Sequence, residues 1–170
     1  APSTNSLYFR ALSPSSGLSD RLHDAVVVNP VRSLSLTPNN TGQTGPGGTI
    51  TYTHLLVNNG NVLEGAGGNS TVNLTIANSQ ASWSAVVYFD ANNNGVIDGG
   101  DTVVTDLSFV SNGGAGIAPG ETIRLLVQVA STPGAPLGMV NIDTLTATTV
   151  NGSLTTPAPA VVSATDITTI

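Results

Sequence analysis

The stretch Thr49-Ile-Thr-Tyr-Thr-His-Leu-Leu-Val-Asn58 decides the fold class of this chain. It is rich in β-branched residues, and its side chains alternate in the pattern of a β-strand that has one buried face. The dipeptide Asn59-Gly60 follows directly and predicts a turn. Because this combination of a short alternating run and a Gly, Pro or Asn turn recurs along the chain, the sequence predicts an all-β protein.

Strand-like runs flank this stretch on both sides. Turn signals such as Pro119-Gly120 and Pro133-Gly134 separate them, and residues 39–48 are expected to form a long turn. No run has a long helical pattern, so about eight to ten short strands predict a β-sandwich. The expected strands are residues 25–28, 31–36, 49–58, 71–77, 83–89, 102–110, 122–130, 141–150 and 161–168.

The composition excludes several classes of partner. Of the 170 residues only 8% are charged, lysine is absent, and the net charge is −6. Nucleic acids and anionic membranes attract basic surfaces, so neither is an expected partner. The sequence has no cysteine and therefore no disulfide framework. No apolar run has the length of a membrane span.

One loop has the pattern of a calcium site. Residues 90–101 read Asp-Ala-Asn-Asn-Asn-Gly-Val-Ile-Asp-Gly-Gly-Asp. Oxygen-bearing side chains fall at loop positions 1, 3, 5, 9 and 12, and the glycine at position 6 suits the tight turn of a loop that wraps a cation. The alternative is an Asn/Gly-rich turn that binds nothing. The predicted Ca²⁺ ligands are the side chains of Asp90, Asn92, Asn94, Asp98 and Asp101 and the backbone carbonyl of Val96.

Two segments resemble known protein families. The loop at 90–101 resembles those of EF-hands and dockerins, with Asp101 at position 12, as in dockerins, instead of glutamate. Residues 46–61, Pro-Gly-Gly-Thr-Ile-Thr-Tyr-Thr-His-Leu-Leu-Val-Asn-Asn-Gly-Asn, resemble the signature of the immunoglobulin-like conserved repeat of bacterial and archaeal surface proteins, which include S-layer-type proteins. The aromatic-Asp-x-Asx-x-Asx-Gly loop of many such domains is matched at 89–95. The resemblance spans roughly residues 31–150 and implies an immunoglobulin-like β-sandwich with a structural or adhesive role at a cell surface.

Residues 1–24 lie outside this resemblance and are expected to form an N-terminal extension, with the sandwich domain at 25–170. Residues 5–12 alternate like a strand with one strongly apolar face, residues 13–17 read as a linker, and residues 18–24 as one helical turn or a loop. Such a strand can complete the open sheet edge of another copy, as in strand-donating pilus subunits, or it can pair within its own sandwich. The candidate polymerisation strand contains Leu7, Tyr8, Phe9, Ala11 and Leu12.

No catalytic constellation is recognisable, and we expect that the protein is not an enzyme. His23 and His54 have no metal-ligand spacing to another histidine or carboxylate, and His54 is expected to be packed or hydrogen-bonded within its strand. The sequence leaves open whether Glu64 and Glu121 converge as a carboxylate pair for glycoside hydrolysis. The absence of lysine excludes a lysine-dependent phosphate loop.

The sequence leaves two functional hypotheses. The first is a structural subunit of an extracellular filament or surface layer, stabilised by Ca²⁺, that forms a homopolymer by N-terminal strand donation. The second is a monomeric calcium-dependent adhesion or glycan-binding module at the cell surface, in which Trp83 and Tyr88 are a candidate sugar-stacking pair, although both fit the core or rim of a strand better. Export is expected because the chain starts at Ala1 instead of methionine, as a product does after removal of a leader. Sequons occur at Asn39, Asn69, Asn73 and Asn151, and the sequence leaves open whether any of them carries a glycan.

Overall fold

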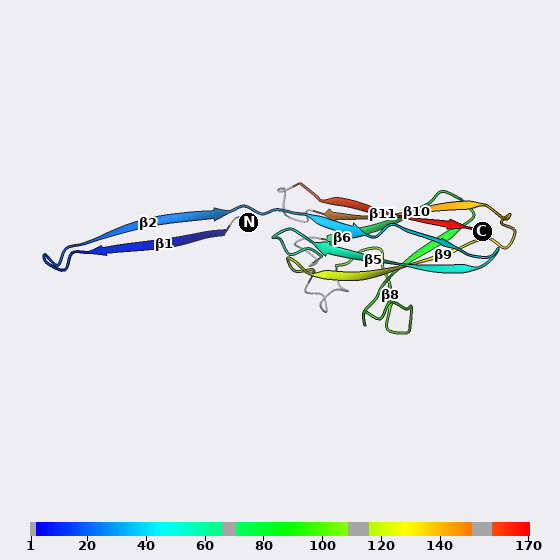
Figure 1. Cartoon of the computed structure of the whole chain (residues 1–170), viewed down its shortest axis with the longest axis horizontal. Helices are drawn as coiled ribbons and strands as arrows, with labels where there is room; N and C mark the ends of the chain where they lie inside the picture. The colour runs from blue at the N-terminus through cyan, green and yellow to red at the C-terminus, as the bar shows by residue number, and fades with distance from the viewer. Residues whose placement is uncertain (1–2, 66–70, 109–115, 151–157) are drawn as a thin grey trace. The chain divides into compact units, whose positions relative to one another are not determined.

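Every regular element in the described residues is a β-strand. The computed structural model describes residues 3–65, 71–108, 116–150 and 158–170. The chain forms two units, residues 1–30 and residues 31–170 (Figure 1). The predicted all-β sandwich is confirmed in the second of these units.

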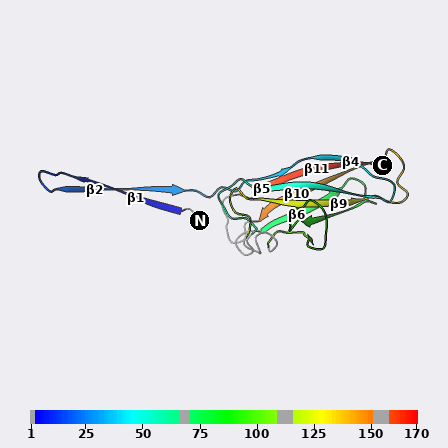
Figure 2. The ribbon, with the colours of Figure 1, turned by 60° about the horizontal axis from the view of Figure 1, so that its bottom comes forward.

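Residues 31–170 fold into two sheets that face each other (Figure 2). Paired strands run antiparallel, except that β4 runs parallel to β11. The four-stranded sheet contains, in order, β4 (Asn40–Gln43), β11 (Val161–Thr169), β10 (Val140–Val150) and β6 (Thr71–Asn78). The five-stranded sheet contains, in order, β3 (Leu34–Thr37), β5 (Thr49–Asn58), β9 (Thr122–Ala130), β7 (Ser84–Phe89) and β8 (Thr102–Val103).

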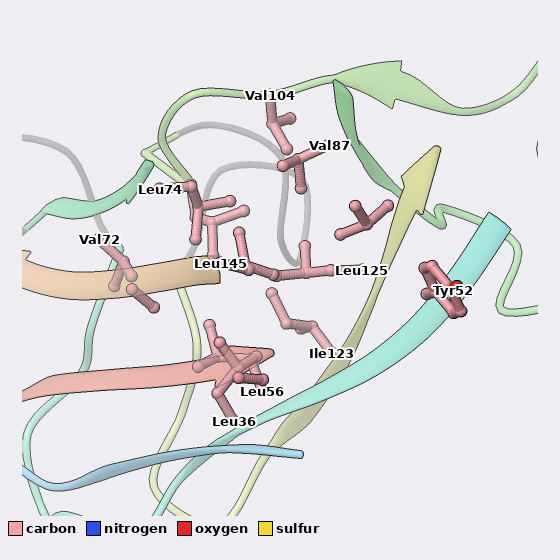
Figure 3. Packing of buried hydrophobic residues seen from close by; sticks show 14 of the residues in the cluster. Leu36, Tyr52, Leu56, Val72, Leu74, Val87, Val104, Ile123, Leu125 and Leu145 are labelled. Carbon is pink, nitrogen blue, oxygen red and sulfur yellow. The ribbon is translucent and has the colours of Figure 1, made fainter. Parts of the chain in front are cut away.

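The core lies between the two sheets and is supplied by alternate residues of each strand. In β5, Tyr52, His54 and Leu56 are buried, whereas the residues between them are more exposed. Leu125 of β9 and Leu145 of β10 have no exposed area and meet from opposite sheets (Figure 3). The strands β5 and β9 have the bounds that the alternation predicts, because an alternating run with one buried face specifies a strand without ambiguity.

Strand β4 lies where the sequence predicts a long turn. Its four residues, Asn-Thr-Gly-Gln, include no apolar side chain, so β4 has no hydrophobic alternation from which it can be predicted. The strand lies close to the core because of Gly42, where a Cβ would overlap the side chains of Ile50 and Tyr52. Pairing with β11, which depends on the tertiary structure, makes this segment a strand.

The predicted strand 102–110 is divided between the two sheets. After β8, Val104 N donates to Val87 O (2.9 Å) in β7, and Leu107 N then donates to Val72 O (2.9 Å) in β6. Residues 104–107, which we call the switch segment, therefore cross from the five-stranded sheet to the four-stranded sheet. Residues 109 and 110 of the predicted strand lie outside the described residues.

Residues 1–30 form a hairpin of their own. β1 (Ser3–Leu12) pairs along its whole length with β2 (Ser19–Val28). In the turn between them, Gly17 N donates to Ser13 O (2.9 Å), and Gly17 has a φ of 69°, which a residue without a Cβ adopts readily.

This hairpin corrects three expectations from the sequence. Residues 13–17 are a turn instead of a linker, and residues 19–24 are strand instead of a helical turn or loop. Residues 25–28, expected as the first strand of the sandwich, belong to β2, and the N-terminal unit ends at Pro30. The candidate polymerisation strand is therefore not a single strand, because β2 already occupies one of its edges. Apolar spacing shows that a segment can be a strand, but it does not show which strand pairs with it.

Adjacent leucines of β5 test the assignment of the core. Leu56 has no exposed area, whereas Leu55 is 36% exposed. We expect that Leu56→Ala lowers the free energy of unfolding by about 2–5 kcal/mol, because it leaves a cavity between the sheets. Leu55→Ala is the matched control and is expected to cost no more than about 1 kcal/mol. Equal losses in urea unfolding would contradict the assignment of the two faces of β5.

Candidate functional site

The predicted calcium loop, residues 90–101, connects β7 to β8. These strands are antiparallel neighbours, and Phe89 pairs with Thr102 at the base of the loop. Asp90 N donates to Arg124 O (3.1 Å) in β9, which fixes the first residue of the loop to the sheet. Asp90 is buried, whereas most of the loop is exposed.

The carboxylate of Asp90 organises the turn of the loop. It accepts hydrogen bonds from Asn94 N (3.1 Å) and Gly95 N (2.8 Å). Gly95 has a φ of 78°, so the glycine at loop position 6 makes the tight turn that the sequence predicts. The guanidinium of Arg124 lies 3.4 Å from Asp90 Oδ2 and donates to Asn93 O (2.6 Å).

The other predicted ligands bond to one another and to the loop backbone. Asp98 Oδ2 accepts from Asn92 Nδ2 and Asn94 Nδ2, at 2.8 Å each, and Asp98 Oδ1 accepts from Gly100 N (2.8 Å). These hydrogen bonds lower the pKa of Asp98, and the bond from Gly100 N has the largest effect. Asp101 accepts from Ala91 N (3.1 Å) and Asp98 N (2.9 Å). Asn94 Oδ1 accepts from Val96 N (2.7 Å).

The donor set of this loop fits a calcium ion by its chemistry. It combines three carboxylates with amide and backbone oxygens, all of them hard ligands, within one short loop. No group of three or more His, Cys or acidic side chains in the described residues is placed to hold a metal ion. Asn92 and Asn94 turn their amide nitrogens toward Asp98, so a calcium ion held by their oxygens would replace these hydrogen bonds.

The N-terminal hairpin has one largely apolar face. Residues that are paired across an antiparallel ladder share a face. Phe9 pairs with Leu22, and Leu7 and Val26 lie on the same face. Leu7, Phe9 and Leu22 are 48%, 59% and 65% exposed. We call this side of the hairpin the apolar face; its apolar residues are Leu7, Phe9, Ala11, Leu22, Val26 and Val28, and the polar residues Asn5, Asp20 and Asp24 lie on the same face.

The opposite face of the hairpin is more polar. The rings of Tyr8 and His23 stack with centroids 4.8 Å apart, and the guanidinium of Arg21 lies 5.3 Å from the centre of the Tyr8 ring. Arg10 pairs with Arg21 across the ladder, which sets two cations side by side. Of the predicted polymerisation residues, Tyr8 and Leu12 thus lie on this face, as the alternation of the sequence predicts.

A buried polar network links the two sheets. His54 Nε2 of β5 lies 2.8 Å from Asp166 Oδ2 of β11, and both side chains are buried. Asn40 Nδ2 donates to Asp166 Oδ1 (2.8 Å). Asp143 of β10 pairs directly with Asp166 and accepts from Asn141 Nδ2 (2.8 Å). Burial, and to a smaller extent the charge of Asp166, raises the pKa of Asp143 to about 6.

The sequence located part of this network. The expectation that His54 is a packed or hydrogen-bonded strand residue agrees with its contact to Asp166. The pairing of Asp143 with Asp166 is not among the expectations from the sequence, although both residues alternate in step with buried residues of their strands, Asp143 with Leu145 and Asp166 with Ala164. This alternation is the feature of the sequence that could predict the burial of both aspartates, because an acidic residue in line with core residues must be buried.

The remaining candidates lie apart from these sites. Glu64 is buried and forms an ion pair with Arg32 (3.3 Å), and Glu121 Oε2 accepts from Ala118 N (2.7 Å). Trp83 is buried, as expected for a core position. Among the sequons, Asn39 and Asn73 are exposed, whereas Asn69 and Asn151 lie outside the described residues.

Comparisons with known proteins identify no family. No protein-family model and no curated protein matches the chain. Solved structures match at low identity. The sixth cohesin of scaffoldin B from Acetivibrio cellulolyticus is 14% identical, with 82% of this chain and 98% of the cohesin chain covered at a TM-score of 0.40. The predicted membership in the immunoglobulin-like conserved repeat therefore stays a prediction.

Other matches differ widely in function. BcpA, the major pilin subunit of Bacillus cereus, is 10% identical, with 95% of this chain and 48% of that chain covered at a TM-score of 0.39. AggA, the major subunit of aggregative adherence fimbriae type I from Escherichia coli, is 16% identical, with 85% and 97% covered at 0.39. A protease of Vibrio cholerae, VesB, matches at 11% identity, with 82% and 32% covered at 0.36. At TM-scores below 0.5, these likenesses indicate no function. In the described part of the chain, no helix is long and apolar enough to cross a membrane.

The raised pKa of Asp143 predicts a pH dependence of stability. An aspartate in the unfolded chain has a pKa of about 4. The folded protein therefore binds this proton more tightly, and the resulting stabilisation is complete below about pH 4 and is lost as the pH rises through about 6. We expect that Asp143→Asn removes this fall between about pH 4 and 6 in urea unfolding. The control is Asp106→Asn, because hydrogen bonds from Ser108 lower the pKa of Asp106 and give the opposite sign. An unchanged profile in Asp143→Asn would contradict the assignment.

Proposed function

We propose that this protein is a calcium-stabilised structural subunit of an extracellular surface assembly, and that it associates with copies of itself through its N-terminal hairpin. The observation that carries the proposal is the apolar face of that hairpin. Its large side chains are about half exposed or more, although residues 31–170 contain a buried core of their own. A two-stranded hairpin alone is marginally stable in water, so this one needs a covering partner.

Burial of the apolar face supplies a driving force for association. Complete burial of a Leu or Phe side chain stabilises by about 1.5–3 kcal/mol, so the residual exposure of Leu7, Phe9 and Leu22 corresponds to a few kcal/mol in all. We propose that the hairpin of one copy binds the sandwich of another, so the two copies use different surfaces in the contact. A contact between them is head-to-tail, and such contacts produce an open filament when they do not close into a ring. A homopolymer is therefore the expected form of the assembly.

Calcium has a stabilising role in this proposal. Asp90, Asp98 and Asp101 lie in one short loop, where their like charges repel each other at neutral pH. A bound divalent cation would neutralise them and would hold the connection between β7 and β8 in one conformation. Loops of this type bind with affinities that extend to the millimolar range in extracellular modules, where calcium is abundant.

Thermal unfolding tests the calcium site. A ligand at 100 times its Kd stabilises by about 2.7 kcal/mol, so we expect that calcium raises the Tm by on the order of 5–10 °C and that a chelator reverses the shift. Asp90→Ala is expected to abolish the response, whereas Asp24→Ala, which removes an exposed carboxylate in the hairpin, is the control that keeps it. A wild-type Tm that does not respond to calcium would refute the calcium part of the proposal.

Paired substitutions on the two faces of the hairpin test self-association. Phe9→Asn combined with Leu22→Asn removes a facing pair from the apolar face, and we expect mainly monomers in sedimentation velocity where the wild type forms large species. Tyr8→Asn combined with His23→Asn changes the facing pair on the other side and is expected to leave association intact. A wild type that stays monomeric at all concentrations would overturn the proposal in favour of the monomeric adhesion module.

A further inference from the structure

The sandwich has an apolar groove at one edge, where the two sheets are incompletely closed. Its volume is about 430 Å³. Leu74, Val87 and Val104 belong to the buried core and lie close together on the side of the core that faces the groove (Figure 3). Ile76 and Ala85 are partly buried beside them. The groove is lined by residues 74–76 of β6, residues 85–87 of β7 and residues 103–105, and none of these residues is charged.

The switch segment explains why the edge is open. In an antiparallel strand the N–H and C=O of one residue point to the same side, and alternate residues point to opposite sides. Leu74 N donates to Thr105 O (2.8 Å), so the outer side of β6 presents the backbone groups of Leu74 and, two residues further, of Ile76. In the described part of the chain, the contacts of the switch segment with β6 end at Leu74. Beyond that point, β6 is an edge strand that can pair with an additional strand.

We propose that this edge of β6 accepts the β1–β2 hairpin of a second copy, an inference that rests on the self-association proposed above. The incoming hairpin extends the four-stranded sheet beyond β6, and its apolar face covers the groove. Leu7, Phe9 and Ala11 recur at every second residue of β1, as do Leu74 and Ile76 in β6. Side chains on one face of neighbouring strands therefore have the same spacing of about 7 Å, and they can pack side by side.

Charge supports a second copy as the occupant. The groove is uncharged, and so is β1 as far as Phe9, so β1 can lie against the groove without burial of a charge of its own. Asp24 of β2 pairs with Leu7 on the same face and lies one strand further from β6. Residues 1–30 contain two arginines and two aspartates and are neutral overall, whereas the net charge of −6 belongs to residues 31–170. On the accepted hairpin, Arg10 and Arg21 face away from the groove. The attraction of an acidic partner offsets the mutual repulsion of these two cations.

Crosslinking between single-cysteine variants of the full chain tests this acceptor edge. The natural sequence has no cysteine, so each introduced thiol is unique. Phe9→Cys protein is mixed with Ala85→Cys protein and treated with a short bismaleimide. The control partner is Thr41→Cys, an exposed position in β4 at the opposite edge of the same sheet. We expect that the Ala85→Cys mixture yields at least tenfold more crosslinked heterodimer than the Thr41→Cys mixture, and that mass spectrometry finds the bridge between residues 9 and 85.

An edge variant provides a second readout. Ile76→Pro removes the outward N–H that an added strand requires but leaves the ladder to β10, and we expect about tenfold weaker association. Thr41→Pro in β4 is the control and is expected to associate like the wild type. If large species persist but residue 9 crosslinks to residue 41, or to neither position, the acceptor edge is wrong and self-association stands. If the wild type neither associates nor crosslinks, the proposed function itself fails.

Discussion

The crossing of residues 104–107 from β7 to β6 is the constraint on which the rest of the structure depends. The hydrogen bonds of Val104 to Val87 and of Leu107 to Val72 close the core along part of one edge of the sandwich. They also leave the outer side of β6 open beyond Leu74 and create the apolar groove between the sheets. A strand that ran on along β7 would have covered the five-stranded sheet alone and would have left β6 exposed along its whole length.

The same segment connects the two proposed sites. The loop at 90–101 ends at β8, and β8 leads directly into the switch segment, so the position of the loop fixes one wall of the groove. Asp90 is anchored to β9 through Arg124, which ties the start of the loop to the centre of the five-stranded sheet.

The buried polar network gives the two sheets a unique alignment. The contact of His54 with Asp166 joins β5 to β11 across the core, and the pairing of Asp143 with Asp166 requires one register of β10 on β11. A slip of one residue would move all of these side chains to the outer faces and would bury their apolar neighbours less well. The burial of Asp143 without charge compensation costs stability at neutral pH, and the raised pKa of this residue reflects that cost.

The sequence by itself determined the strands whose alternation is strong, such as β5 and β9, and it determined the tight turn at Gly95, because side-chain periodicity and backbone sterics are local properties. It also placed Leu7 and Phe9 on one face of a strand. Only the tertiary structure decided that β2 pairs with β1, that the polar segment 40–43 is a strand, and that residues 104–107 change sheets. These features depend on which backbone groups meet across long distances in the chain, and hydrogen bonds between main chains have no side-chain pattern through which a sequence can specify the partner.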